Sequence, residues 1–281
     1  MGPRTRSSRR DGTTLPPDIP RALTIAGSDS GGGAGIQADL KTFQALGVFG
    51  MSAITAVTVQ NTKGVSGYEE LSPDTVADQI RAVVTDIGVD AAKTGMLASA
   101  AIVDSVAEVL RELRVANLVV DPVSVSKHGH PLLAEEAVGA LRAQILPLAT
   151  LVTPNLPEAA LLAGFPVQTP EDMERAGVAI LELGPGAVLV KGGHLVGAGA
   201  TDLLVTAEGI EPIEGERIDT PHTHGTGCVL SAAITANLAR GEELGRSVRD
   251  GKVFVTEAIR AHLEIGHGIG PVNPSFGIPA H

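Results

Sequence analysis

The sequence predicts an α/β fold with a mostly parallel central sheet that helices cover on both faces. Short aliphatic and β-branched runs alternate along the chain with longer segments whose apolar residues recur every three or four positions. Such alternation is typical of parallel sheets, because a helix carries the chain back between neighbouring strands. With 281 residues, 43% of them hydrophobic, the chain is long enough to bury a large core. We expect one domain over residues 21–281 and a disordered tail over residues 1–20.

The expected strands are short and apolar, and the last two flank a turn at Glu208-Gly209, which predicts a hairpin. They are Arg21–Ala26, Met51–Val59, Ala91–Thr94, Leu118–Asp121, Leu151–Thr153, Ala187–Lys191, Leu203–Thr206 and Ile210–Arg217. The expected helices show apolar residues at helical spacing, as Val76, Ile80 and Val84 do in the second of them. They are Ala34–Leu46, Asp74–Thr85, Ser99–Leu113, Glu135–Leu146, Leu156–Ala163, Glu171–Leu183, Gly227–Ala239 and Leu244–Leu263.

Charge and composition exclude several classes of protein. The net charge is −11, and a general nucleic-acid binder needs a basic face, so we expect no nucleic-acid partner. Aromatic residues are 2% of the chain and Trp is absent, so a nucleotide base would have to lie in an aliphatic slot. No apolar run reaches the length of a bilayer span, and we expect no membrane partner. A single cysteine fits a reducing compartment, and we expect the cytoplasm.

Polar residues follow most of the predicted strands. In open α/β sheets, ligands bind at the carboxyl ends of the strands, so these residues are the first candidates for a site. They are Gly27-Ser28-Asp29, Gln60-Asn61, Lys93-Thr94-Gly95-Met96, Asp121-Pro122-Val123, Pro154-Asn155 and Lys191-Gly192-Gly193.

The segment Thr223–Cys228 places two glycines, a hydroxyl and the only cysteine at a predicted helix start. The first turn of a helix has unpaired N–H groups and the positive end of the helix dipole, so it can bind an anion. The same field lowers the pKa of a thiol, which makes Cys228 a candidate base or nucleophile. The alternative is a glycine-rich loop that enters a core helix with a buried cysteine.

A dinucleotide site is not favoured. Gly33–Ala38 matches the pattern G-x-G-x-x-A, but the pattern also needs an acidic residue about 20 positions later. The segment Ala53–Gln60 has none. The chain also lacks a Walker A motif, so a nucleotide site would be of another type.

Four further residues have both a functional and an ordinary interpretation. Asn155 and Glu158 lie three positions apart at a helix start, where their oxygens suit Mg²⁺, but Glu also compensates the helix dipole there. Lys191 at a strand end suits a transferring phosphate, or is a surface lysine. Gln60 can donate to and accept from a heteroaromatic ring, or make a strand-end contact.

Histidines occur in two close pairs, His128 with His130 and His222 with His224. Zinc sites usually need three or four ligands, so we interpret these as loop histidines. His224 is close enough to the glycine-rich turn to contact a bound phosphate.

Taken in order, the motifs resemble those of the hydroxymethylpyrimidine/phosphomethylpyrimidine kinases, the thiamine-pathway branch of the ribokinase superfamily. The similarity runs from Arg21 to Pro274. The matching segments are Ala26–Thr42, Thr55–Thr62, Lys93–Leu97, Val120–Val123, Thr153–Ala159, Val190–His194, Thr223–Cys228 and Gly266–Val272.

The resemblance implies a three-layer ribokinase-like fold and an enzyme that uses ATP and Mg²⁺. It implies phosphorylation of 4-amino-5-hydroxymethyl-2-methylpyrimidine and then of its monophosphate, which gives the pyrophosphate for thiamine, and a homodimer. By the same resemblance, the pyrimidine pocket would comprise Gly27, Asp39, Gln60, Met96 and Val123. Lys191 and Thr226 would bind the nucleotide phosphates, Asn155 and Glu158 would hold Mg²⁺ through water, and Gly225, Thr226, Gly227 and Cys228 would form the anion hole. Cys228 would accept the hydroxymethyl proton.

Two alternatives stay open. A pyridoxal kinase shares the fold and the glycine-rich turn, although Gln60 favours an aminopyrimidine. A weakly catalytic pyrimidine-binding module would have lost residues such as Lys191 or Cys228, which are present. We expect the segment Val123–Pro131 to form a lid.

Overall fold

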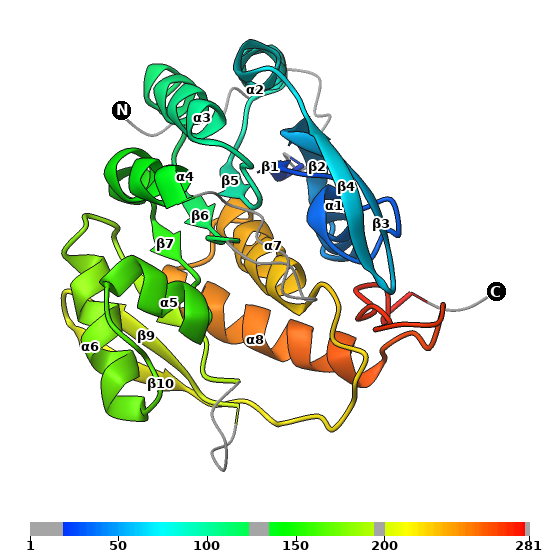
Figure 1. The fold of residues 1–281 in the computed structure, drawn as a ribbon, viewed down its shortest axis with the longest axis vertical. Coiled ribbons are helices and arrows are strands. Elements are labelled where there is room, and N and C mark those ends of the chain that lie inside the picture. The colour runs from blue at the N-terminus through cyan, green and yellow to red at the C-terminus, as the bar shows by residue number, and fades with distance from the viewer. Residues whose placement is uncertain (1–18, 124–134, 194–199, 279–281) are drawn as a thin grey trace, which may run out of the picture.

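The computed structural model describes residues 19–123, 135–193 and 200–278, and confirms the predicted α/β class (Figure 1). An eight-stranded sheet has the order β10-β9-β8-β7-β6-β5-β1-β2. Its strands are β1 (Arg21–Ala26), β2 (Phe49–Ile54), β5 (Ala91–Thr94), β6 (Leu118–Val120), β7 (Leu151–Val152), β8 (Val188–Val190), β9 (Asp202–Thr206) and β10 (Gly209–Ile213).

The six strands from β2 to β8 in this order run parallel, and β9 runs antiparallel to both of its neighbours, β8 and β10. The parallel strands β1, β5, β6, β7 and β8 are almost wholly buried, as strands covered on both faces must be. The predicted hairpin is confirmed as β9–β10. The mostly parallel sheet therefore presents the carboxyl ends of β1, β5, β6, β7 and β8 along one edge.

The predicted strand Met51–Val59 is wrong in its extent. It breaks at Thr55 into β2 and β3 (Ala56–Asn61), and β3 leaves the main sheet to pair with β4 (Gly64–Glu70), a strand we did not predict. The Thr55 hydroxyl donates to the Met96 carbonyl at 2.7 Å and its N–H donates to the Ala26 carbonyl at 3.0 Å. These contacts tie the bend to the ends of β1 and β5. The β-branched run contains no glycine or proline, so the sequence has no local signal for the bend.

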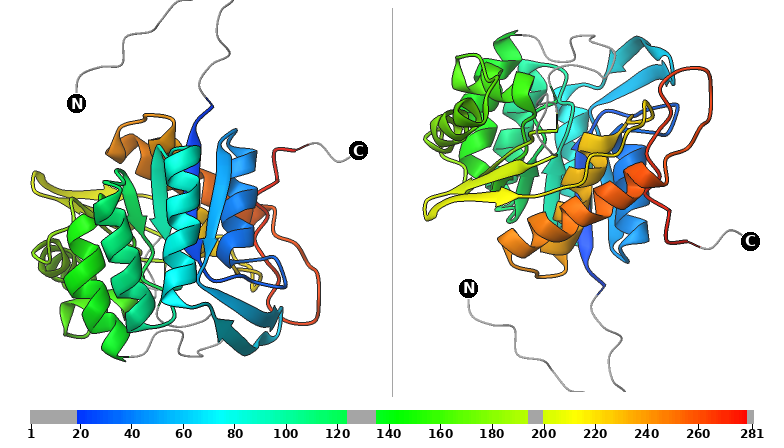
Figure 2. Two further views of the ribbon diagram at one scale, coloured as in Figure 1. Left: turned by 90° about the horizontal axis from the view of Figure 1, so that it is seen from above. Right: turned by 90° about the horizontal axis from the view of Figure 1, so that it is seen from below.

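Helices cover both faces of the sheet, and Figure 2 shows the layers from two further sides. One face packs against α1 (Gly35–Ala45), α7 (Thr226–Ala239) and α8 (Leu244–Arg260). The other packs against α2 (Pro73–Asp86), α3 (Ala100–Glu112), α4 (Glu135–Ala140), α5 (Leu156–Ala163) and α6 (Pro170–Leu181). The predicted helix Glu135–Leu146 ends early as α4 and continues as a π turn, Leu141–Ile145, and a 3₁₀ turn, Leu146–Leu148, that contains Pro147.

Helix α7 is the central helix of its face. Every residue from Val229 to Ala239 is buried, and the helix contacts α1, α8, β1, β5 and β6. A helix that is apolar on all sides is stable only inside a core. Its burial fixes the N-terminus of α7 at the carboxyl-end edge of the sheet.

Several predictions fall outside the described residues. The tail is described only at its last two positions, and the predicted lid only at Val123. Both stay predictions. Among the described helices, none combines the length and the apolar character that a membrane crossing requires.

The packing of α6 on β9 gives a test of the fold. A Cβ at Gly177 would lie 2.5 Å from Val205 Cγ2, so Gly177→Ala forces the two elements apart. We expect a loss of about 1–3 kcal/mol in the free energy of unfolding, measured by urea denaturation. Gly139→Ala in α4 is the matched control. A Cβ there meets no atom within 4 Å, and alanine favours a helix by up to about 1 kcal/mol. Equal effects of the two substitutions would contradict the close packing.

Candidate active site

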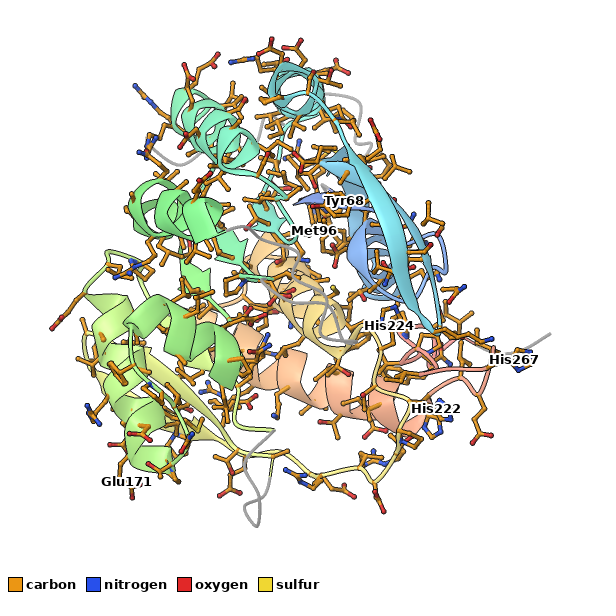
Figure 3. The ribbon with its side chains drawn as sticks, in the orientation of Figure 1. Tyr68, Met96, Glu171, His222, His224 and His267 are labelled. Carbon is orange, nitrogen blue, oxygen red and sulfur yellow. The ribbon has the colours of Figure 1, made fainter. Side chains whose placement is uncertain are left out.

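A cavity of about 770 Å³ opens at the carboxyl-end edge of the sheet. Residues from the ends of β1, β5, β6 and β8, from β3, and from the N-termini of α5 and α7 line it. In Figure 3, Met96 lies near the strand ends and His224 lies where the chain enters α7. Among the candidate residues, the cavity brings together Gly27, Gln60, Met96, Val123, Asn155, Glu158, Lys191, Gly225, Thr226, Gly227 and Cys228.

The turn before α7 has the geometry of an anion site. Gly225 is the N-cap residue with φ of +83°, a conformation that glycine adopts without strain, and no side chain caps the helix. A Cβ at Gly225 would collide with the carbonyl oxygen of Gly33, so the position needs glycine on steric grounds also. The first-turn N–H groups of α7 have no partner within the helix and lie at the cavity. This turn can therefore hold a phosphate or a developing oxyanion.

The thiol of Cys228 does not behave as the sequence suggests. Burial raises its pKa to about 12, the Lys93 ammonium opposes this shift, and the carboxylates of Asp39 and Asp121 add to it. The sequence predicted a lowered pKa, whereas the pKa is raised, and the largest cause is the removal of the thiolate from water. The thiol is protonated at neutral pH.

Among the residues that the family resemblance assigns to the site, Asp39 is the one that does not line the cavity. It lies on α1 with no exposed surface, and both its carboxylate oxygens contact Lys93 Nζ, at 3.0 and 2.9 Å. The Thr24 hydroxyl donates to the same carboxylate at 2.7 Å. The expectation that Asp39 lines a ligand pocket is corrected, since Lys93 takes the place at the cavity wall and Asp39 lies behind it. Burial alone would lower the pKa of Lys93, but the Asp39 carboxylate holds it above its ordinary value.

A second charged cluster surrounds Lys191 at the end of β8. Lys191 Nζ lies 3.1 Å from Asp121 Oδ1 and 4.0 Å from Glu158 Oε2. Asp121 is buried and accepts from the hydroxyls of Thr153 and Ser231, each at 3.4 Å. The sequence analysis named Asp121 among the strand-end candidates but gave it no role in the site. The signal for it was the carboxylate directly after a buried strand.

Asn155 and Glu158 form a capping box at the start of α5. The Asn155 N–H donates to Glu158 Oε2 at 2.8 Å, and the Glu158 N–H donates to Asn155 Oδ1 at 2.9 Å. The pair therefore caps the helix, and Glu158 lies in its first turn, where the sequence analysis expected a carboxylate to compensate the dipole. Both side chains also line the cavity, where carboxylate and amide oxygens are the donors that Mg²⁺ prefers. The donor set fits a magnesium ion held through its waters.

The glycine-rich loop after β1 is folded around one carboxylate. Asp29 accepts from the N–H groups of Gly31, Gly33 and Ala34 at 2.8 to 3.0 Å. Burial opposes ionisation, but these bonds and the contact with His224 hold the pKa of Asp29 below its ordinary value. Because these amides are already paired, the loop supports the site and does not supply a phosphate cradle.

The two histidines before α7 face different partners. His224 is buried, with Nε2 at 2.9 Å from Asp29 Oδ2. His222 stacks on His262, with ring centroids 5.1 Å apart, and its Nδ1 accepts from the Gly270 N–H. Figure 3 shows His222 further out than His224. His128 and His130 lie outside the described residues.

The cavity lining also includes aliphatic side chains from the C-terminal part of the chain. Val255 and Ile259 of α8 lie there with Ile218. Asp202 and Lys252 form a buried ion pair of 2.7 Å beside them, and Asp202 also accepts from the Gly192 N–H. No Phe, Tyr or Trp among the described residues lines the cavity.

Comparisons with known proteins agree with this geometry. Residues 29–273 match the family described as "Phosphomethylpyrimidine kinase". A "Hydroxymethylpyrimidine/phosphomethylpyrimidine kinase" of Streptomyces coelicolor is 51% identical over 265 residues, which cover 94% of this chain and 98% of that protein.

Two solved structures are also similar. The phosphomethylpyrimidine kinase of Clostridium difficile 630 has a TM-score of 0.77 at 47% identity, and the match covers 85% of this chain and 99% of that one. An ADP complex of Bacillus subtilis pyridoxal kinase has a TM-score of 0.86 at 43% identity, and the match covers 92% and 98% of the two chains.

The Lys93–Asp39 pair predicts a large effect on stability. Asp39→Asn leaves the Lys93 charge buried without its partner, and we expect a loss of about 3–5 kcal/mol in the free energy of unfolding. The double variant with Lys93→Met should lose less than the sum of the two single variants. Arg81→Met, which breaks the exposed Arg81–Glu112 pair, is the control and should change the free energy of unfolding far less, because water already solvates both charges. Additive losses would refute the pairing.

The raised pKa of Cys228 predicts a late titration. Since the chain has one cysteine, the ultraviolet absorbance of the thiolate reports this residue alone. We expect no thiolate signal in the folded protein up to about pH 10, whereas the protein in guanidinium should titrate near the ordinary value of about 8.5. A folded-state midpoint near neutral pH would restore the original expectation. Cys228→Ser supplies the baseline.

Proposed function

The chain belongs to the phosphomethylpyrimidine kinase family, and on that basis we propose that this cavity performs two phosphoryl transfers from ATP. The first acceptor is the hydroxyl of 4-amino-5-hydroxymethyl-2-methylpyrimidine, and the second is its monophosphate, which gives the pyrophosphate used for thiamine. The observation that carries the proposal is the uncapped N-terminal turn of α7, which shares one cavity with the ring-recognition candidates Gln60 and Met96.

The mechanism follows from the arrangement of charge. Phosphoryl transfer needs the two oxygens in line and stabilisation of the charge on the transferred group more than it needs covalent chemistry. The amides of residues 225–228 would stabilise that charge, and Lys191, fixed by Asp121 at 3.1 Å, would contact the nucleotide phosphates with Thr226. The transferred phosphoryl group and the acceptor hydroxyl would then lie next to each other at the start of α7.

Cys228 is our proposed proton acceptor. The transition state of phosphoryl transfer is loose, so the hydroxyl proton leaves late and early deprotonation by a strong resting base is not required. With a pKa of about 12, the thiol can accept this proton only when the thiolate is stabilised as it forms, and the nearby Lys93 ammonium would supply that stabilisation.

Mg²⁺ is proposed as the second cofactor. It would neutralise the phosphate charge during transfer. Asn155 and Glu158, held in their capping box beside Lys191, would orient its waters.

The ring pocket would lie between Gly27, Met96, Val123 and Gln60. A Cβ at Gly27 would lie 3.2 Å from Met96 Sδ, so glycine leaves room for the thioether and for a flat ring beside it. Met96 would pack on the ring face, and the Gln60 amide would bond to its edge. We also propose a homodimer and a cytoplasmic location, as the family and the single cysteine suggest.

A pyridoxal kinase remains the second candidate, because the similar Bacillus subtilis structure bears that name. A purely binding module is less well supported, since Asn155, Glu158, Lys191 and Cys228 all line one cavity.

The test is a coupled ATP-consumption assay with Mg²⁺ on the hydroxymethylpyrimidine, its monophosphate and pyridoxine in parallel. We expect turnover of both pyrimidines and much slower turnover of pyridoxine. Cys228→Ser should fold normally and lose most of the turnover, and a near-normal rate would remove Cys228 from its role. Turnover of pyridoxine without activity on the monophosphate would favour the second candidate.

A further inference from the structure

Three side chains from distant parts of the sequence form a continuous contact beside the ring pocket. Asp29 follows β1, Gln60 lies on β3, and His224 precedes the anion-site turn. His224 Nε2 lies 2.9 Å from Asp29 Oδ2 and 3.4 Å from Gln60 Nε2. His224 and Asp29 are buried, while Gln60 is partly exposed and lines the cavity with them.

The partners of Asp29 fix the state of His224. The ionised carboxylate of Asp29 is already surrounded by N–H donors of its loop, and it accepts a hydrogen from His224 Nε2 as well. Nε2 of His224 therefore carries its hydrogen and is a donor. The single hydrogen of Nε2 points to Asp29, so the Gln60 NH₂ group drawn 3.4 Å away would set two N–H donors against each other, and the amide oxygen is the end that suits the place beside His224.

Thr58 leads to the same orientation from the opposite side. Its hydroxyl has one hydrogen, which it donates to the Ser28 carbonyl at 2.8 Å. Its other contact, at 3.3 Å, is drawn to Gln60 Oε1, but with its hydrogen already used the hydroxyl can only accept there, so the amide is better assigned with its NH₂ group at this place. Both neighbours therefore select one orientation, with the Gln60 oxygen beside His224 and its NH₂ beside Thr58.

That orientation matters for the choice of ring. In a 4-aminopyrimidine an amino N–H donor lies next to a ring nitrogen that accepts. An amide can bond to both only when its oxygen faces the amino group and its NH₂ group faces the ring nitrogen. In pyridoxine the ring hydroxyl has carbon neighbours, and no such adjacent acceptor exists.

We propose that His224, held by Asp29, is a specificity-determining positioning residue that fixes the sense of the Gln60 amide and so favours an aminopyrimidine over a pyridine. The proposal rests on the proposed function. His224 acts through Gln60, and its effect is on ring binding.

The experiment compares His224→Leu with His224→Gln, using kcat and KM for the hydroxymethylpyrimidine and for pyridoxine. Leucine fills the space without a donor, whereas glutamine can present an N–H at the reach of Nε2. We expect His224→Leu to raise KM for the pyrimidine about tenfold with kcat largely kept, and to change pyridoxine turnover less than about threefold. His224→Gln should recover most of the loss. In a Gln60→Ala background, His224→Leu should bring no further loss of selectivity.

Three results would overturn the proposal. These are an equal fall in kcat/KM for both substrates, a fall in kcat without a change in KM for the pyrimidine, or equal defects in the leucine and glutamine variants. The comparison of kcat with KM for the pyrimidine tests the proposal even where pyridoxine turnover is too slow to measure. If His224→Leu does not fold, His224→Asn replaces it, because its shorter side chain keeps an amide but does not reach Gln60.

The wild-type measurement separates this proposal from the proposed function. No turnover of the pyrimidine by the wild type would refute the function itself. Turnover with a selectivity that His224→Leu leaves unchanged would refute only the role of His224.

Discussion

The burial of α7 is the constraint on which the site depends. Its residues from Val229 to Ala239 are all buried, and the hydroxyls of Ser231 and Thr235 bond to carbonyls of the helix itself, so the helix is stable between α1, α8 and the sheet. This placement directs its unpaired N–H groups to the edge where β1, β5, β6 and β8 end. The anion site is thus a result of core packing, and Gly225 and Gly33 only allow the entering chain to approach closely enough.

Charge in the cavity is organised as buried pairs. Lys93 with Asp39, Lys191 with Asp121 and Lys252 with Asp202 each place an ammonium within 3.1 Å of a carboxylate. Burial alone would lower the pKa of Lys93 and of Lys191, but the carboxylate beside each holds its pKa above the ordinary value. Rigid ion pairs of this kind hold positive charge in fixed positions before a substrate arrives, which is the requirement for electrostatic stabilisation of phosphoryl transfer.

Local patterns in the sequence were sufficient for most of the fold. Strands such as Leu118–Val120 are uniformly apolar, and helix starts such as Asn155 have capping residues, so both could be predicted. The bend at Thr55 could not, because it arises from long-range bonds to Ala26 and Met96. The same holds in the site. The strand-end rule located the cavity residues, but the depth of Asp39 and the desolvation of Cys228 depend on what packs around them, and no spacing in the sequence reports that.

The desolvated thiol has a consequence for the chemical durability of the site. Peroxides and other oxidants attack the thiolate form of cysteine far faster than the thiol, and oxidation beyond the sulfenic acid is largely irreversible. Since burial keeps Cys228 protonated, its sulfur is a poor target in the resting protein. The environment that weakens Cys228 as a resting base therefore also keeps the more oxidisable thiolate a minor form, although the sulfur lies at the wall of the cavity.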